Sequence, residues 1–206
     1  MEQIRSRKNQ YILHLRALAK SADARREAEE YVCDGEKLLR EALQFGAEVT
    51  SVLWREAAAF SLPDGIAQYA ADAELVEYAS PLMHSPGPVF TVRIPAMRLP
   101  EPLRRVIVLE GVQDPGNVGT VIRTANALGM DAVVLTGACA DLYGPKTVRA
   151  AMGALFRQPV LTRTLRAIDR AELVSEIVVA AQEERMEAVA ALCAAAALHK
   201  KVKVVK

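Results

Sequence analysis

The residues best suited to chemistry lie in one segment, Glu110 to Asn126. An apolar run ends here and a helical pattern begins, and ligands of open α/β sheets bind beyond the carboxyl ends of the strands. Pro115 and Gly116 predict a tight turn, and Asn117 is predicted to cap the helix that follows. Because a helix start offers unpaired amides and a partial positive charge, the pattern indicates a phosphate site.

Two further positions extend this candidate anion site. Gly119 has no side chain in the first helical turn, so another backbone or a ligand can come close. Arg123 is predicted to share a helix face with Thr120 and Ala127, since residues three and four apart are neighbours on a helix. The same pattern also fits a capped helix with one solvated arginine. Neither a phosphate-loop Gly-Lys-[Ser/Thr] nor a dinucleotide-binding Gly-x-Gly-x-x-Gly follows.

The elements that position this segment alternate between strand and helix. The patterns predict strands at 105–109, 132–135, 160–161, 177–180 and 194–198, and helices at 117–128, 146–156 and 169–175. The helix after the loop is predicted to bury Val118, Val121, Ile122, Ala125 and Leu128. Strand, helix and strand in this order predict a parallel α/β sheet.

The N-terminal part also alternates, and a proline-rich boundary follows it. Helices are predicted at 9–19 and 36–45, and strands at 31–33, 49–54, 72–78 and 89–94. Three prolines within residues 95–102 favour an extended linker. We therefore predict a first domain at 1–94, a linker at 95–103 and a second domain at 104–206.

Charge is balanced overall but uneven along the chain. The 206 residues are 51% hydrophobic and 25% charged, with a formal net charge of +1, so bulk charge does not indicate nucleic acid. Residues 1–26 and 142–170 each carry +5, whereas residues 47–91 carry −5. Two basic segments indicate a surface that faces phosphates, and solvated helix faces are the alternative.

Several classes of protein are disfavoured by the sequence. No apolar run reaches the ~18 residues of a membrane-spanning helix, and the N-terminus has no signal-like stretch. Three cysteines and three histidines are widely spaced, which indicates neither a disulfide framework nor a metal site. We expect a cytoplasmic location, no membrane partner and no metal.

The loop and helix described first resemble a known motif. In order and spacing, Pro115, Asn117, Gly119 and Arg123 are similar to the first signature motif of the SpoU (TrmH-type) RNA 2′-O-ribose methyltransferases. Residues 145–156 resemble the stretch that these enzymes carry after the second strand, with Ala151 where many members have serine. Residues 31–43 resemble the family's N-terminal substrate-binding domain. The three matches lie in the family's order within residues 5–165.

The resemblance implies a fold and an activity. The fold would be a ribosomal-protein-like α/β substrate-binding domain plus a parallel-sheet α/β methyltransferase domain of the SPOUT type, whose knot is an exception to the rule that chains do not thread loops. The activity would be methyl transfer from S-adenosylmethionine to a ribose 2′-hydroxyl of rRNA or tRNA, by a homodimer. Arg123 and Asn117 would be the catalytic residues. Because a guanidinium stays protonated, we expect Arg123 to hold the adjacent phosphate and stabilise the developing alkoxide.

Weaker expectations concern other side chains. Six basic residues are candidates for contact with the RNA backbone, and a solvated surface role is the alternative for each: Arg5, Lys8, Arg25, Arg26, Lys146 and Arg149. Glu110 is predicted to end a strand at the rim, and bracing the loop is the alternative to a role in the site. Trp54 and Tyr69 are predicted to be core residues rather than base-stacking platforms. Cys139 is predicted to be inert.

The sequence departs from the family pattern near its C-terminus. The Gly-x-Glu-x-x-Gly loop and the Ser-Leu-Asn-Val helix start of the family do not occur; the chain runs instead through Ala188–Leu198 into a basic tail that starts at His199. Because those motifs form most of the donor pocket and the knot, we expect an incomplete methyltransferase domain and assign no donor-binding residue. The alternative function is a non-catalytic RNA-binding or dimerisation module. An unrelated nucleotide-binding protein is disfavoured by the absent phosphate-loop glycines.

Overall fold

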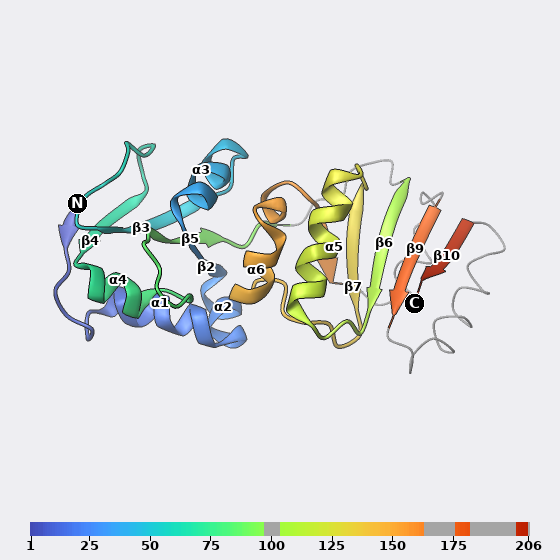
Figure 1. The fold of residues 1–206 in the computed structure, drawn as a ribbon, viewed down its shortest axis with the longest axis horizontal. Coiled ribbons are helices and arrows are strands. Elements are labelled where there is room, and N and C mark those ends of the chain that lie inside the picture. Colours follow the sequence, from blue (N-terminus) through green and yellow to red (C-terminus); the bar gives the residue numbers. More distant parts are fainter. Residues whose placement is uncertain (97–103, 163–175, 182–200, 206) are drawn as a thin grey trace. The chain divides into compact units, whose positions relative to one another are not determined.

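The chain forms two compact units, and each has its own five-stranded sheet (Figure 1). The computed structural model describes residues 1–96, 104–162, 176–181 and 201–205. The first unit comprises Met1–Pro95 with Tyr143–Pro145, and the second comprises Ala96–Leu142 with Lys146–Lys206. Within the described ranges, none of the helices combines the length and the apolar character that crossing a membrane requires.

The first unit has a mixed sheet with helices on both faces. Its elements are β1 (Glu2–Gln3), α1 (Gln10–Lys20), α2 (Ala22–Ala28), β2 (Glu30–Asp34), α3 (Glu36–Gln44), β3 (Val49–Arg55), β4 (Ala67–Ala71), α4 (Ala73–Ala79) and β5 (Val89–Arg93). The strand order is β1-β4-β3-β5-β2. Strand β5 runs antiparallel to β2 and β3, and the other pairs are parallel.

Most of the elements predicted for this unit are confirmed, and one is wrong. The helices at 9–19 and 36–45 and the strands at 31–33, 49–54 and 89–94 match α1, α3, β2, β3 and β5. The strand predicted at 72–78 is helix α4, because the Asp72 carboxylate caps it by accepting a hydrogen bond from the Leu75 N–H at 2.8 Å. Strand β4, which has no β-branched residue, escaped prediction.

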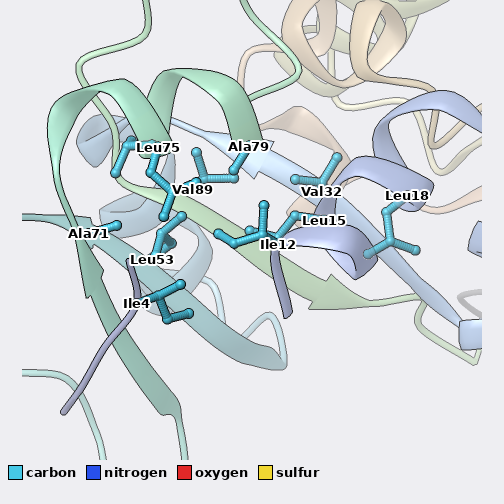
Figure 2. Packing of buried hydrophobic residues seen from close by; sticks show 11 residues of the cluster. Ile4, Ile12, Leu15, Leu18, Val32, Leu53, Ala71, Leu75, Ala79 and Val89 are labelled. Carbon is cyan, nitrogen blue, oxygen red and sulfur yellow. The ribbon is translucent and has the colours of Figure 1, made fainter. Parts of the chain in front are cut away.

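The core of the first unit forms where α1 and α4 pack on the sheet (Figure 2). Ile12, Leu15 and Leu18 lie at helical spacing on α1 and are fully buried. They join the labelled side chains of α4 and the strands in Figure 2, such as Leu75 and Leu53. Because neighbouring side chains of a strand point to opposite faces, Trp54 lies on the other face from Leu53.

The two aromatic residues predicted to be core residues pack as expected. Trp54 is 1% exposed and makes an edge contact with Phe60 at 5.3 Å between ring centroids. Tyr69 is partly buried against the core and stacks on Tyr11 at 4.0 Å. These rings are occupied by packing inside the first unit.

The second unit has a parallel sheet, as predicted. Its elements are β6 (Arg105–Glu110), α5 (Pro115–Ala127), β7 (Ala132–Thr136), α6 (Pro145–Ala151), the 3₁₀ helix η1 (Ala154–Phe156), β8 (Val160–Thr162), β9 (Glu176–Ala181) and β10 (Lys201–Val205). The order is β10-β9-β6-β7-β8, with every pair parallel. All residues of β7 are buried, which is typical of a strand covered on both faces.

A predicted helix end and a predicted buried residue of this unit are wrong. The helix predicted at 146–156 stops at Ala151, because Met152 and Gly153 have left-handed backbone angles, φ 46° and 80°, that end it. Leu128, predicted to be buried, is 60% exposed, because α5 ends at Ala127.

The remaining expectations concern the end of the chain. Strand β10 lies in what the sequence suggested was a basic tail; its alternation of lysine and valine is a strand signal. The predicted elements at 169–175 and 194–198, and the linker from residue 97 on, lie outside the described residues.

The Asp131 carboxylate, which binds the start of β6, makes the stability of the folded chain depend on pH. Its carboxylate accepts hydrogen bonds from the backbone N–H groups of Arg104 and Arg105, each 2.7 Å long. The bond from Arg105 is the main reason why the pKa of the Asp131 carboxyl lies below its ordinary 3.8. A carboxyl whose pKa is lowered by folding stabilises the folded state above its unfolded pKa, and this contribution is lost as the pH falls through the folded pKa.

We therefore expect Asp131→Asn to unfold at a lower urea concentration than wild type at about pH 7. As the pH falls below about 5 and through the folded pKa, the variant is expected to lose less stability than wild type, because it has no such carboxyl to protonate. Urea unfolding followed by circular dichroism measures both. Parallel stability curves for the two proteins would contradict the prediction.

Candidate active site at the carboxyl edge of the second sheet

Two polar side chains end adjacent strands at the carboxyl edge of the second sheet. Glu110 ends β6 and Thr136 ends β7, and the two residues are register partners. They are 8% and 4% exposed. The N–H of Gly111 donates to the carbonyl of Thr136 at 2.9 Å, so the β6–α5 loop starts by pairing with the end of β7. The expectation that Glu110 ends a strand is confirmed.

The loops after β6 and β7 are tied together by backbone and thiol contacts. The Cys139 thiol lies 3.2 Å from the carbonyl oxygen of Thr136 and 3.3 Å from that of Leu109, to which it donates. The N–H of Ala140 donates to the carbonyl of Val112 at 2.9 Å. The Cys139 thiol thus helps to hold the two loops together. These contacts fix the edge of the sheet from which the chain enters α5.

Helix α5 is capped by Asp114, not by Asn117. The Asp114 carboxylate accepts a hydrogen bond from the Asn117 N–H at 2.8 Å, and Pro115 occupies the first helical position. Asn117 is therefore the third residue of the helix, and its exposed side chain is not used for capping. The prediction that Asn117 caps the helix is wrong because the cap lies three residues earlier.

The acidic cap changes the expected anion site. A carboxylate at the helix start already satisfies an amide and offsets the positive end of the helix dipole. Gly116 preserves this cap, since a Cβ at this position would lie 2.9 Å from the Asp114 Oδ1 atom. The helix start is thus occupied by the chain's own carboxylate, and positive charge comes from side chains further along α5 and on α6.

Gly119 is the point where α6 touches α5. A Cβ at Gly119 would lie 2.5 Å from the Ala150 Cβ, 2.6 Å from the Thr147 carbonyl oxygen and 2.8 Å from the Ala151 nitrogen. All three distances are shorter than real Cβ contacts, so only glycine allows this approach. The expected close approach at Gly119 is therefore made by the backbone of α6.

Arg123 lies on the solvent face of α5, one turn after Gly119. Asn117, Thr120, Arg123 and Ala127 are all exposed. The predicted face of Thr120, Arg123 and Ala127 is confirmed. Asn117 and Arg123 are separated by about 9 Å along the helix axis, at 1.5 Å per residue. The Arg123 Nη1 lies 2.7 Å from the Sδ of Met152, the residue that follows α6.

Lys146 and Arg149 are exposed at neighbouring positions of α6. Across the described part of the chain, no ion pair joins Arg123, Lys146 or Arg149 to a carboxylate. Their charges are consequently available to an anionic ligand. Ala151, where many SpoU proteins have serine, is fully buried in the contact with α5.

The basic candidates of the first unit have different surroundings. Arg25 is only 6% exposed, and its guanidinium donates to the carbonyl of Leu18. It is buried by helix packing, so the expectation that Arg25 contacts RNA is not supported. Arg26 is exposed and pairs with Asp23. Arg5 and Lys8 are exposed.

Asp114 and Met152 were not predicted from the sequence to belong to the site. Asp114 could have been found, since aspartate followed by proline is a frequent start of a helix. Met152 carried no sequence signal, because only the fold brings it to Arg123. Among the described residues, no group of three histidine, cysteine or acidic side chains could hold a metal ion.

The second unit matches a family model. Residues 104–205 match the SpoU rRNA Methylase family. This range contains the loop after β6, α5 with Arg123, and α6. This part of the chain belongs to the SpoU rRNA Methylase family. The fold class and the family resemblance predicted from the sequence are thereby confirmed.

Known rRNA methyltransferases match different shares of this chain. The 23S rRNA (guanosine(2553)-2′-O)-methyltransferase RlmP of Bacillus subtilis is 34% identical over 168 residues, which are 80% of this chain and 66% of that protein. The human mitochondrial rRNA methyltransferase 3 is 40% identical over 67 residues, 32% of this chain and 16% of that protein. The chain thus spans less than two thirds of the length of these relatives.

Solved structures show the same fold. The SpoU methyltransferase AviRb from Streptomyces viridochromogenes, in complex with AdoMet, aligns with a TM-score of 0.72 and 25% identity, covering 85% of this chain and 74% of that one. The AdoMet-bound rRNA methyltransferase from Sinorhizobium meliloti aligns with a TM-score of 0.79 over 100% of this chain and 88% of that one. At 20% identity, the second likeness shows the fold.

The crossing at Gly119 yields a prediction about stability. Gly119→Ala places a Cβ against backbone atoms of α6, which cannot move as a side-chain end can. We expect a loss of about 1–3 kcal/mol in the free energy of unfolding. Thr120→Ala on the exposed face of the same helix is the control, and it is expected to leave stability equal or higher because alanine favours helix. Equal urea midpoints for the two variants would disprove the packing account.

Proposed function

We propose that the chain is an RNA 2′-O-ribose methyltransferase that uses S-adenosylmethionine to methylate a ribose of rRNA or tRNA. The observation that carries the proposal is Arg123, an exposed arginine without a carboxylate partner among the described residues, on the first helix beyond the carboxyl end of β6 in a SpoU domain. The names of the relatives, which act on rRNA, support rRNA as the substrate class.

The reaction defines what the side chains must do. The ribose 2′-oxygen forms a bond to the methyl carbon while the carbon–sulfur bond breaks, and S-adenosylhomocysteine leaves with the bonding electron pair. The hydroxyl proton goes to a base or to water. When bound, S-adenosylmethionine supplies an activated methyl group, so the protein's main tasks are to position the hydroxyl and to favour its deprotonation.

Arg123 suits the positioning task. Its planar guanidinium can donate two parallel hydrogen bonds to a phosphate next to the reacting ribose. A fixed positive charge nearby lowers the cost of the developing alkoxide. A guanidinium stays protonated, so it does not accept the proton itself. Asn117, whose side chain is not used as a cap, can donate to and accept from the substrate and so orient it.

The carboxyl edge of the second sheet has polar groups that fit the methyl donor. The buried polar groups Glu110 and Thr136, at the ends of β6 and β7, are chemically compatible with a cationic, hydrogen-bonding ligand. Glu110 would face the positive sulfonium and Thr136 would offer a hydroxyl. The space beside Gly119, where a side chain would lie, is filled by α6 and is not available to the donor.

The finer features of the proposal rest on the family resemblance. We propose that the working form is a homodimer in the cytoplasm. We also propose that residues 1–94 form the RNA-binding domain, joined by the linker 95–103 to the methyltransferase domain at 104–206. Arg5, Lys8 and Arg26 are exposed and remain its candidate RNA contacts.

Arg123→Ala is expected to abolish methyl transfer and to weaken RNA binding no more than Lys146→Ala or Arg149→Ala does, because it removes one phosphate contact among several. Single-turnover methylation of rRNA with labelled S-adenosylmethionine measures transfer, and a shift assay measures binding. Thr124→Ala, an exposed neighbour on α5, is the control and should react like wild type. Unchanged turnover in Arg123→Ala would remove this residue from the mechanism. If wild type binds RNA but calorimetry shows no binding of the donor, the non-catalytic module is the better description.

Lys146→Ala and Arg149→Ala test whether α6 contacts phosphates. Each is expected to weaken RNA binding and to reduce the slope of log affinity against log salt by about 1, because one fewer counterion is released. The control is Arg105→Ala, which removes the same charge from an exposed position at the start of β6, at the opposite edge of the second sheet. An identical change in slope for Arg105→Ala would show that net charge, and not α6, is responsible.

A further inference from the structure

The guanidinium of Arg123 is held by an uncharged group. Its Nη1 lies 2.7 Å from the Sδ of Met152. A thioether is a weak hydrogen-bond acceptor that carries no charge. A carboxylate in the same place would bind more strongly but would neutralise the arginine and compete with a phosphate. Contact with sulfur orients the guanidinium and leaves its charge for the substrate.

The backbone of Met152 is unusual for this residue type. Its φ of 46° lies in the left-handed region, directly after the last residue of α6. Helices that end in this conformation usually have glycine there, since a side chain disfavours it. The Met152 side chain is also 54% exposed, so burial in the core does not explain a large apolar residue at this position. What Met152 does contact is the Arg123 guanidinium.

The position of Met152 relative to Arg123 is fixed by the crossing of the two helices. Gly119 admits the backbone of Thr147 and Ala151 to α5, and Arg123 lies one turn further along α5. Met152 directly follows Ala151, and its N–H donates to the carbonyl of Arg149 at 3.2 Å. The sulfur is therefore attached to a point of α6 that is already packed against α5.

We propose that Met152 is a positioning residue for Arg123, which it holds by a sulfur contact in the orientation that the substrate phosphate requires. The inference rests on the proposed function of Arg123 in methyl transfer. Met152 does not contact the reacting atoms in this proposal; it acts through the guanidinium. A misplaced arginine would reduce the rate of transfer more than the affinity for RNA.

Three substitutions separate this role from a structural one. Met152→Gly suits the left-handed backbone but removes the side chain, so the melting temperature should stay equal or rise while kcat falls by about tenfold to a hundredfold with little change in KM. Met152→Leu keeps the bulk without an acceptor and should also lower kcat. Met152→Gln offers an amide oxygen at similar length and should restore most of the activity. Wild-type kcat in Met152→Leu, or a Gln variant no better than Leu, would overturn the proposal. A parallel loss of melting temperature and kcat in Met152→Gly would also overturn it.

A second measurement does not depend on activity. Nitrogen-15 relaxation of the Arg123 Nε–H group in the full chain should show a rigid side chain in wild type and in Met152→Gln, and a mobile one in Met152→Gly and Met152→Leu. Met83→Gly, at an 86% exposed methionine of the first unit, is the control and should leave this relaxation unchanged. If the wild-type chain fails to methylate RNA, the proposed function fails, and the relaxation still decides whether Met152 holds Arg123. Equal mobility of Arg123 in all variants rejects the positioning role.

Discussion

The close packing of α5 and α6 at Gly119 is the constraint on which the site depends. Because a Cβ would meet two backbone atoms of α6 within 2.8 Å, the two helices approach more closely than side chains normally permit. The hydroxyl of buried Thr147 also donates to the Asp141 carbonyl at 2.7 Å, which anchors the start of α6 to the loop before it. The exposed basic residues of α6, and Met152 directly after it, are thereby placed relative to Arg123.

The two basic segments, residues 1–26 and 142–170, carry the same net charge but differ in how their side chains are paired. In the first unit much of the charge of residues 1–26 is used internally: Arg7 pairs with Glu74 of the acidic segment and lies over the Tyr78 ring, and Arg16 donates to the Tyr78 carbonyl. In the second unit Lys146 and Arg149 of the run 142–170 have no such carboxylate partner among the described residues. Availability to phosphate therefore depends on fold contacts that no local count of charge reveals.

The sequence was informative where the signal is local, and it failed where a distant contact decides. The apolar strands and the exposed face of α5 follow from periodicity, and the close approach at Gly119 from the missing side chain. The cap was placed at Asn117 instead of Asp114, since both types are good caps and only the hydrogen bond distinguishes them. The burial of Arg25 and the sulfur contact of Met152 arise from packing between separate elements, so neither has a local signature.

The exposure of the basic groups agrees better with a polymer than with a small nucleotide as substrate. Small ligands are usually recognised in concave sites that bury most of their surface. Arg123, Lys146 and Arg149 lie instead on outer faces of two helices, where a nucleic-acid backbone can reach several of them at once. Rigid helices locked at Gly119 hold these charges at fixed spacing, which loops could not do. In the proposed function a long anionic chain would gain register from such spacing, and Arg123, in contact with the neutral sulfur of Met152, would act on a single nucleotide of that chain.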